Sequence, residues 1–248
     1  MNDKLKHLIA EYIDSTIKIL KKKQLNILLS ISYADFIKHQ SLYMLYLQRT
    51  KTIEQIVQTW IDMKLQKSEE TIFGDWLEGL AIFICQKVYG GWKSGITGID
   101  LEFDKDNIRY IVSIKSSPNW GNSRQIPKML SDFSAAKKTL RTSNSKLNIV
   151  AVNGCCYGKD SKPDKGDYFK YCGQEFWSFI SENENLYLDI IEPLGHKAAE
   201  RNKEYQILYS QMISEFTVQF LNEFCKETGE VDWIKLVKFN SGRKTNHE

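Results

Sequence analysis

The sequence has few cysteines, no long apolar segment and almost no net charge, and each shortage excludes a class of protein. Its five cysteines are an odd number without CxxC spacing, which argues against zinc ribbons and disulfide frameworks. No segment approaches the roughly 18 unbroken apolar residues of a membrane-spanning helix, and the first residues lack an apolar signal core. We therefore expect a soluble, cytoplasmic protein in a reducing setting, with no membrane partner.

The formal net charge is only +3 over 248 residues, so the chain as a whole is not built to attract polyanions. Positive charge is concentrated instead between residues 115 and 150, where seven basic residues accompany a single acid, Asp132. Such a segment attracts a phosphate-bearing partner. A solvated loop and helix face is the other interpretation of the same charge run.

Two segments just before this basic run have the alternation of β-strands. Apolar residues alternate with Asp100 and Glu102 over residues 99–103, and residues 108–115 alternate in the same way. Residues 104–107 between them have turn composition, so the simplest connection is an antiparallel hairpin.

The pairing of this hairpin decides which polar side chains share a face. If Phe103 pairs with Ile108, Asp100 lies opposite Ile111, and Asp100, Ser113 and Lys115 share one face of the sheet. A slip of one residue would separate the acid from the lysine. The pattern therefore predicts a carboxylate, a hydroxyl and an ammonium close together.

An acid and a lysine so arranged suit metal-dependent cleavage of a phosphodiester bond. That reaction needs a metal ion to activate water, an acid to hold the metal, and a cation to orient the water or offset developing charge. Asp100 is the candidate metal ligand and Lys115 the candidate cation. The backbone carbonyl of Ile114 is a candidate second ligand, because hard cations accept carbonyl oxygens.

Ser113 supplies a hydroxyl where such sites usually have a second carboxylate, and a hydroxyl is a poorer ligand for magnesium. Another acid is then needed. Glu78 is the preferred candidate because it lies at the border of the apolar stripe of its helix. Glu102, on the same strand face as Asp100, is the alternative. The structural alternatives are a pairing of Asp100 with Arg109 and a solvated Glu78.

The rest of the pattern predicts an α/β fold with a mixed β-sheet flanked by helices. We expect helices over residues 69–89 and 125–140, and a buried strand over 147–152 that lies parallel to the Lys115 strand. A further strand is expected over 186–191, and Thr52 to Gln55 predicts a capping box. The chain divides into a helical region (1–68), for dimerisation or DNA contact, a core (69–195) and a C-terminal helical segment (196–248).

The core residues resemble the PD-(D/E)xK nucleases. The likeness rests on Gly98-Ile99-Asp100, on Ser113-Ile114-Lys115 with serine at the middle acidic position, and on the helix of Glu78. The longer segments 113–123, 152–158 and 172–177 resemble bacterial type II restriction endonucleases, most closely those that cut interrupted GGNCC-type sites. The likeness extends over about residues 70 to 240.

This resemblance implies a restriction-endonuclease-like core and cleavage of double-stranded DNA with Mg²⁺. It implies a homodimer in which each protomer cuts one strand, and a cognate DNA methyltransferase as genetic partner. The alternatives are a DNA repair or junction nuclease with the same core, and a non-catalytic DNA-binding module that has lost its catalytic set at Ser113.

Residues that contact DNA are expected in the loop and helix start after Lys115. Base edges are read by arginine, asparagine and glutamine, whereas phosphates accept bonds from many polar groups. Trp120 is also a candidate packing residue. The candidates for DNA contact are Asn119, Trp120, Asn122, Ser123, Arg124, Gln125 and Lys128.

Overall fold

The computed structural model describes residues 3–38, 41–47, 51–143, 145–198 and 203–243. Within these residues the chain divides into two compact units, each built from two separate stretches. The first unit comprises residues 1–20 and 72–200, and the second comprises residues 21–71 and 201–248. Two helices, α1 (Asp3–Ser30) and α4 (Ile53–Tyr89), contribute residues to both units.

A five-stranded mixed sheet forms the centre of the first unit, with strand order β1-β2-β3-β4-β5. The neighbouring pairs β1–β2 and β2–β3 are antiparallel, whereas β3, β4 and β5 are parallel. The strands are β1 (Trp92–Lys93), β2 (Leu101–Lys105), β3 (Ile108–Lys115), β4 (Asn148–Cys155) and β5 (Phe169–Cys172). The predicted α/β fold class is confirmed, and so is the parallel pairing of β3 with β4.

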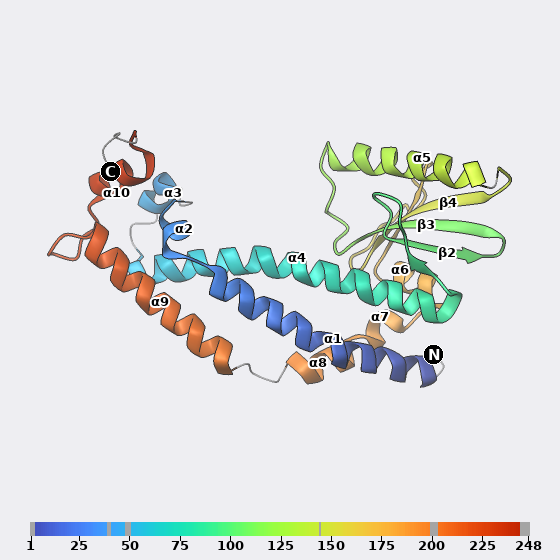
Figure 1. Ribbon diagram of the computed structural model, residues 1–248, viewed down its shortest axis with the longest axis horizontal. Coiled ribbons are helices and arrows are strands. Elements are labelled where there is room, and N and C mark those ends of the chain that lie inside the picture. Colours follow the sequence, from blue (N-terminus) through green and yellow to red (C-terminus); the bar gives the residue numbers. More distant parts are fainter. Residues whose placement is uncertain (1–2, 39–40, 48–50, 144, 199–202, 244–248) are drawn as a thin grey trace. The chain divides into compact units, whose positions relative to one another are not determined.

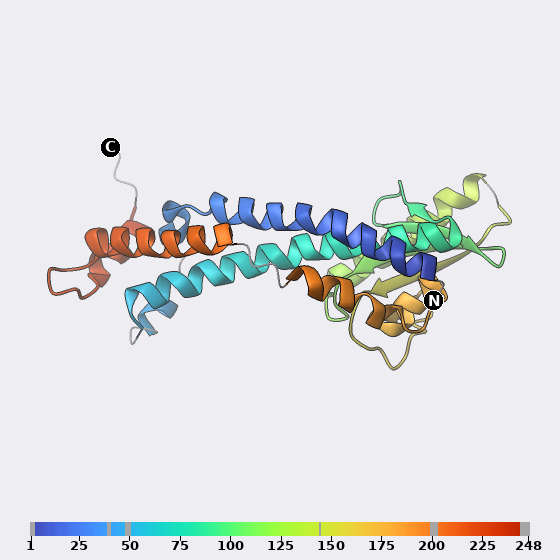
Figure 2. The same cartoon turned by 90° about the horizontal axis from the view of Figure 1, so that it is seen from below.

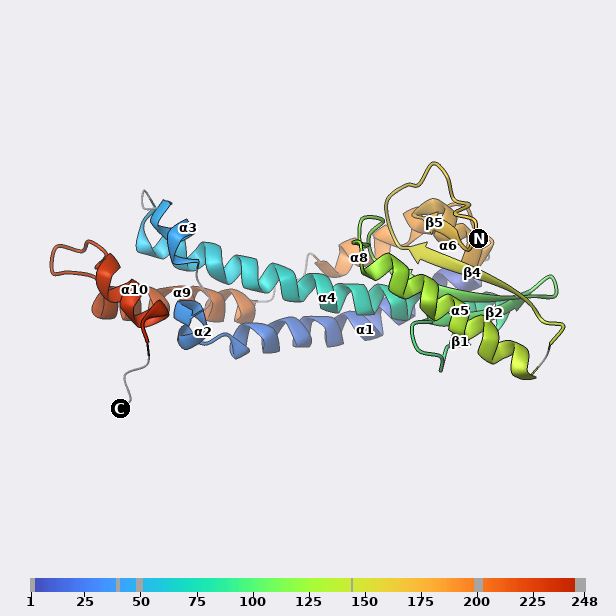
Figure 3. The same cartoon turned by 90° about the horizontal axis from the view of Figure 1, so that it is seen from above.

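Helices cover both faces of this sheet (Figure 1). Helix α5 (Gln125–Ser143) lies across one face, where Met129 and Phe133 pack on Ile111 and Ala151. Figure 3 shows α5 from above, lying over the strands. The crossover from β3 through α5 to β4 therefore has the order that the sequence predicts.

The opposite face of the sheet is covered by the N-terminal part of α1, the C-terminal part of α4 and helix α6 (Gln174–Ser181). Figure 2 shows these parts of α1 and α4 side by side. The indole nitrogen of Trp76 on α4 donates to the Thr16 hydroxyl on α1 over 2.9 Å. The predicted helix over residues 69–89 is thus the second half of a longer helix, which ends where Gly90 has a positive φ of 68°.

Residues 186–191 were predicted to form a strand, and this prediction is wrong. They form helix α7 (Leu186–Asp189) and the start of helix α8 (Ile191–Ala198). Leu186 and Ile190 are buried while Leu188 between them is 51% exposed. Buried side chains four residues apart are typical of a helix. The alternation of apolar residues in the sequence favoured a strand instead.

In the part of the chain that is described, the second unit is built from helices, with one isolated β-bridge between Cys225 and Val231. Besides parts of α1 and α4, it contains α2 (Tyr33–Lys38), α3 (Leu42–Leu47), α9 (Lys203–Phe224) and α10 (Trp233–Ser241). Its core centres on aromatic contacts of Phe36 with Phe216 and Phe220. The predicted capping box begins α4: the Thr52 N–H donates to Gln55 Oε1, and the Gln55 N–H donates to Thr52 Oγ1.

Candidate active site

The β2–β3 hairpin brings the predicted motif residues together, although its register differs from the prediction. Phe103 lies opposite Tyr110, not Ile108, because a two-residue turn of Asp106 and Asn107 connects the strands. Both turn residues have positive φ, 52° and 62°, as a type I′ turn requires. The shift is by two residues, so the predicted sharing of a face is retained.

Asp100 lies where β2 separates from β3, one residue beyond the last paired residues, Leu101 and Val112. Its Oδ2 accepts the backbone N–H of Ile114 over 2.6 Å and lies 3.5 Å from the Ser113 hydroxyl. The Lys115 ammonium is 3.9 Å from the same oxygen. Asp100, Ser113 and Lys115 therefore converge at one point along the edge of β3.

The carbonyl of Ile114 faces the edge of β3 on which Asp100 lies. The Val112 carbonyl accepts the Asp100 N–H over 2.8 Å, and carbonyls two residues apart in a strand point to the same side. The pairing of β3 with β2 ends at Val112, two residues before Ile114. The Ile114 carbonyl is therefore directed to the same edge of β3 as the Ile114 N–H that binds the Asp100 carboxylate.

Glu78 approaches the same carboxylate from α4. Burial raises the pKa of the Glu78 carboxyl above its ordinary value, and repulsion from the Asp100 carboxylate raises it further. Lys93 on β1, 3.5 Å from Glu78 Oε1, acts in the opposite direction. The oxygen atoms of Asp100 and Glu78 are of the ligand type that a hard divalent ion takes.

Glu102 is already engaged by other side chains. Its Oε1 accepts the Ser94 hydroxyl over 2.7 Å and its Oε2 lies 3.4 Å from Arg109 Nη1. The same guanidinium donates to both oxygens of Asp104 and stacks over Trp92. Arg109 therefore binds Glu102 and Asp104, not Asp100, and Glu78 is the stronger candidate for a second acidic ligand.

A cleft of about 560 Å³ opens between the end of β3 and the start of α5. Three cations and one acid are among its lining side chains, so it is suited to a polyanion. The residues that line it are Gly98, Ser113, Lys115, Trp120, Arg124, Gln125, Lys128, Met129 and Asp132. Six of the residues predicted for catalysis or DNA contact are in this group, whereas Asp100 and Glu78 are not.

Two of the predicted DNA-contacting residues also form the cap of α5. The Asn122 Oδ1 accepts the N–H groups of Arg124 and Gln125, and Gln125 Oε1 accepts the N–H of Asn122. This is a reciprocal capping arrangement. Asn119, Ser123 and Arg124 are exposed.

Within the described residues, no group of three or more His, Cys, Asp or Glu side chains is arranged to hold a metal ion. This agrees with the serine at position 113, which leaves Asp100 and Glu78 as the neighbouring acids. None of the described helices is long and apolar enough to cross a membrane.

Comparison with known families gives the family of the chain. The family model of the type II restriction endonuclease EcoO109I matches residues 7–202, which is most of the chain. The chain belongs to the EcoO109I family. Among curated proteins no match is found. Membership of the EcoO109I family makes the chain a type II restriction endonuclease, whose substrate is DNA.

The match to the EcoO109I family covers every residue of the geometry described above. It also covers three residues of this region that were not assigned a role from the sequence: Asp132, Asn153 and Lys170. Asp132 pairs with Lys128 and packs against Gly98, where a Cβ would lie 2.5 Å from its carboxylate. For Asn153, the available signal was a polar residue directly after the apolar strand segment.

Proposed function

We propose that this enzyme hydrolyses phosphodiester bonds of double-stranded DNA at a short specific sequence, with the reacting phosphate beside Asp100, Ser113 and Lys115. The convergence of the Asp100 carboxylate and the Lys115 ammonium, 3.9 Å apart at the mouth of a basic cleft, carries this proposal. The family supports the reaction class, and the geometry supports the choice of residues.

Mg²⁺ is the proposed cofactor, held by the Asp100 carboxylate, the Ile114 carbonyl and Glu78. These are oxygen ligands, which magnesium prefers. When bound, Mg²⁺ supplies a water of lowered pKa and polarises the scissile phosphate. Glu102 remains the alternative acid, and Ser113 contributes a hydroxyl to the same edge.

The chain's own residues orient the reactants. The Ile114 N–H fixes the direction of the Asp100 carboxylate. The Lys115 ammonium orients the attacking water and offsets negative charge that develops on the phosphate. Because Lys115 is partly exposed, with 34% of its side chain accessible, it is reachable from the cleft.

The cleft beside this site is the proposed path of the DNA backbone. Arg124 and Lys128 supply phosphate contacts, and Asn119 and Ser123 are exposed in the preceding loop. Asn122 and Gln125 contact DNA through side-chain atoms other than the two oxygens that cap α5. Trp120 also lines the cleft.

The assembly and the target sequence are also proposals. We propose a homodimer, because cutting both strands of a duplex needs two such sites, and a cytoplasmic location with a cognate methyltransferase that protects host DNA. A GGNCC-type target follows from the likeness of the segments after Lys115 to enzymes of that specificity. The same proposal assigns dimerisation or DNA contact to residues 1–68, catalysis to residues 69–195, and packing on the core to residues 196–248.

The test is incubation of the purified protein with phage DNA, with and without Mg²⁺. Discrete fragments that depend on magnesium support the proposal, whereas a smear indicates a repair or junction nuclease. DNA binding without metal and without cleavage indicates a non-catalytic module. Asp100→Asn and Lys115→Ala are each expected to reduce cleavage by about 10³-fold or more while the protein stays folded, and Lys226→Ala, at an exposed lysine outside the basic segment 115–150, is the matched control.

A further inference from the structure

Asn153 is a buried polar residue next to the candidate site, with an exposed fraction of 1%. It lies in β4, where it is paired with Ser113 of β3. Buried polar side chains are retained where their hydrogen bonds are satisfied, and an unsatisfied one is costly. The partners of Asn153 therefore indicate what it does.

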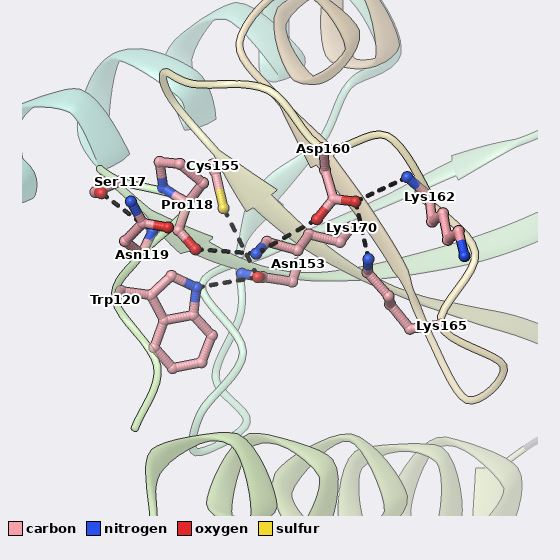
Figure 4. Close-up of polar contacts among 10 residues, drawn as sticks. All are labelled: Ser117, Pro118, Asn119, Trp120, Asn153, Cys155, Asp160, Lys162, Lys165 and Lys170. Carbon is pink, nitrogen blue, oxygen red and sulfur yellow. Dashed lines mark hydrogen bonds and ion pairs between the residues drawn. The ribbon is translucent and has the colours of Figure 1, made fainter. Parts of the chain in front are cut away.

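Both ends of the Asn153 amide are engaged, each by a group that fits only that end. The Nδ2 group donates to the Ser113 carbonyl over 3.1 Å, and Oδ1 accepts the indole N–H of Trp120 over 3.1 Å. A carbonyl can only accept a hydrogen bond, and an indole N–H can only donate one. If the Asn153 amide were turned by 180°, its nitrogen would face the indole N–H and its oxygen would face the Ser113 carbonyl, so neither bond could form. Figure 4 shows the indole nitrogen of Trp120 directed at Asn153.

The ring that Asn153 holds is in contact with Lys115. The Lys115 ammonium lies 5.5 Å from the centroid of the Trp120 ring, within the range of a cation–π interaction. The same ammonium is 3.9 Å from Asp100 Oδ2. A continuous series of contacts thus leads from Asn153 through Trp120 to the group proposed to orient the attacking water.

The backbone before Trp120 is fixed by other residues. Lys170 on β5 donates to the Pro118 carbonyl over 2.9 Å and pairs with Asp160 (Figure 4). Gly158, with φ of 93°, packs so closely on Pro118 that a Cβ would lie 2.4 Å from the ring. Since the backbone is clamped in this way, the hydrogen bond that the Trp120 indole donates to Asn153 acts on the orientation of the indole.

We propose that Asn153 is a positioning residue of the active site, which holds Trp120 against Lys115 and so keeps the ammonium beside the Asp100 carboxylate. This inference rests on the proposed function of Lys115. It assigns to Asn153 no contact with DNA, and its effect is on the rate of the cleavage step and not on DNA affinity.

The kinetic test compares single-turnover cleavage by Asn153→Leu, Trp120→Phe and the double variant. Each single variant is expected to cut roughly ten- to a hundredfold more slowly, because a small misplacement of a reacting group has that effect. In Asn153→Leu the DNA affinity should change by less than about threefold, because Asn153 is buried. The double variant is expected to be no slower than the slower single variant, since both remove the same interaction. Asn148→Leu, at an exposed position of the same strand, is the control and should cut normally.

The structural test follows the indole protons of the six tryptophans by ¹⁵N NMR, with the Trp120 signal assigned by its loss in Trp120→Phe. In the wild type this proton should exchange slowly with water, and in Asn153→Leu quickly. The indoles of Trp76 and Trp177, which donate to Thr16 and to the Cys156 carbonyl, are internal controls and should stay protected.

These measurements separate the inference from the function on which it rests. A wild-type protein that cuts no DNA contradicts the proposed function. The positioning role is overturned instead by an Asn153→Leu variant that cuts at the wild-type rate, or by a Trp120 proton equally protected in both proteins. Should Asn153→Leu fail to fold, Trp120→Phe decides alone: it keeps an aromatic face but lacks the N–H, so a wild-type rate in that variant overturns the role.

Discussion

Glu78 and Glu102 are both close to Asp100 in sequence or space, but different neighbours surround them. Glu102 is 4% exposed and bound by Ser94 and Arg109. Glu78 is held by one lysine at 3.5 Å and is repelled by Asp100. Removing the charge of a buried carboxylate that is bound on both oxygens leaves its partners unpaired, whereas a carboxylate near a second acid is a candidate ligand for a cation.

We therefore expect Glu78→Gln and Glu102→Gln to affect different properties. Glu78→Gln should weaken Mn²⁺ binding, measured by calorimetry in the presence of DNA, and slow cleavage by about 10²-fold or more. Glu102→Gln should lower the free energy of unfolding by about 1 to 3 kcal/mol while cleavage persists under conditions where the protein is folded. If Glu102→Gln weakened Mn²⁺ binding and Glu78→Gln lowered only the stability, Glu102 would be the ligand instead of Glu78.

Asp160 supports the loop before Trp120 through ion pairs with Lys165 and Lys170, at 2.8 and 3.5 Å. The hydrogen bond from Lys165 and that from the Lys162 N–H lower the pKa of the Asp160 carboxyl below its ordinary value of 3.8. A lowered folded-state pKa contributes stability above the unfolded value, and this contribution is lost as the pH falls through the folded value.

Asp160→Asn should therefore lower stability at neutral pH by about 1 kcal/mol and have a smaller effect at acidic pH. Urea unfolding of both proteins across this range measures the difference. The wild-type and variant curves should converge as the pH falls below 3.8, the ordinary pKa of the group. A difference that is constant with pH would show that the ion pairs do not stabilise the loop.

At the scale of elements, the turn at Asp106 and Asn107 sets the register that places Asp100 beside Ser113. Left-handed conformations at both turn residues are tolerated by asparagine, aspartate and glycine and are strained for β-branched residues. Asn107→Val is expected to cost about 1 to 2 kcal/mol, whereas Asn107→Gly should be neutral or stabilising. Thermal unfolding distinguishes these outcomes, and equal stability of the two variants would argue against a type I′ turn.

Elements with strong local signals could be predicted from the sequence. The capping box at Thr52, the helix after Pro118 and the parallel strand after it depend on side-chain patterns within a few residues, and the structure has all three. The shared face of Asp100, Ser113 and Lys115 was also predicted, because a register error of two residues preserves alternation.

Other elements depend on contacts that no local pattern contains. Strand β5 follows a loop rich in lysine and aspartate, and its pairing with β4 comes from long-range contacts. In the sequence, Asn153 is a polar residue at a strand end like many others. Only the fold places Trp120, 33 residues earlier in the chain, against it. Cleft residues contributed by α5, such as Asp132, likewise become neighbours of Gly98 only through tertiary packing.

At the scale of the whole molecule, the proposed homodimer is tested by the number of DNA strands that are cut in one binding event. Mixed dimers of the wild type and Asp100→Asn, purified through two different affinity tags, contain one active site. They are expected to nick a supercoiled plasmid that carries one target site, whereas wild-type dimers linearise it. Gel electrophoresis measures the products, and linearisation by mixed dimers at the wild-type rate would contradict one cut per protomer.

The first compact unit is built from two stretches that are far apart in the sequence, and this affects folding during synthesis. Ile9, Ile13 and Ile17 are buried in the first unit against residues of α4 and the sheet, all of which follow residue 71. A ribosome therefore exposes this apolar stripe before its covering residues have been synthesised. During that interval the nascent chain offers a binding site for a chaperone, and a chain terminated before α4 is complete would keep the stripe uncovered and be prone to aggregate.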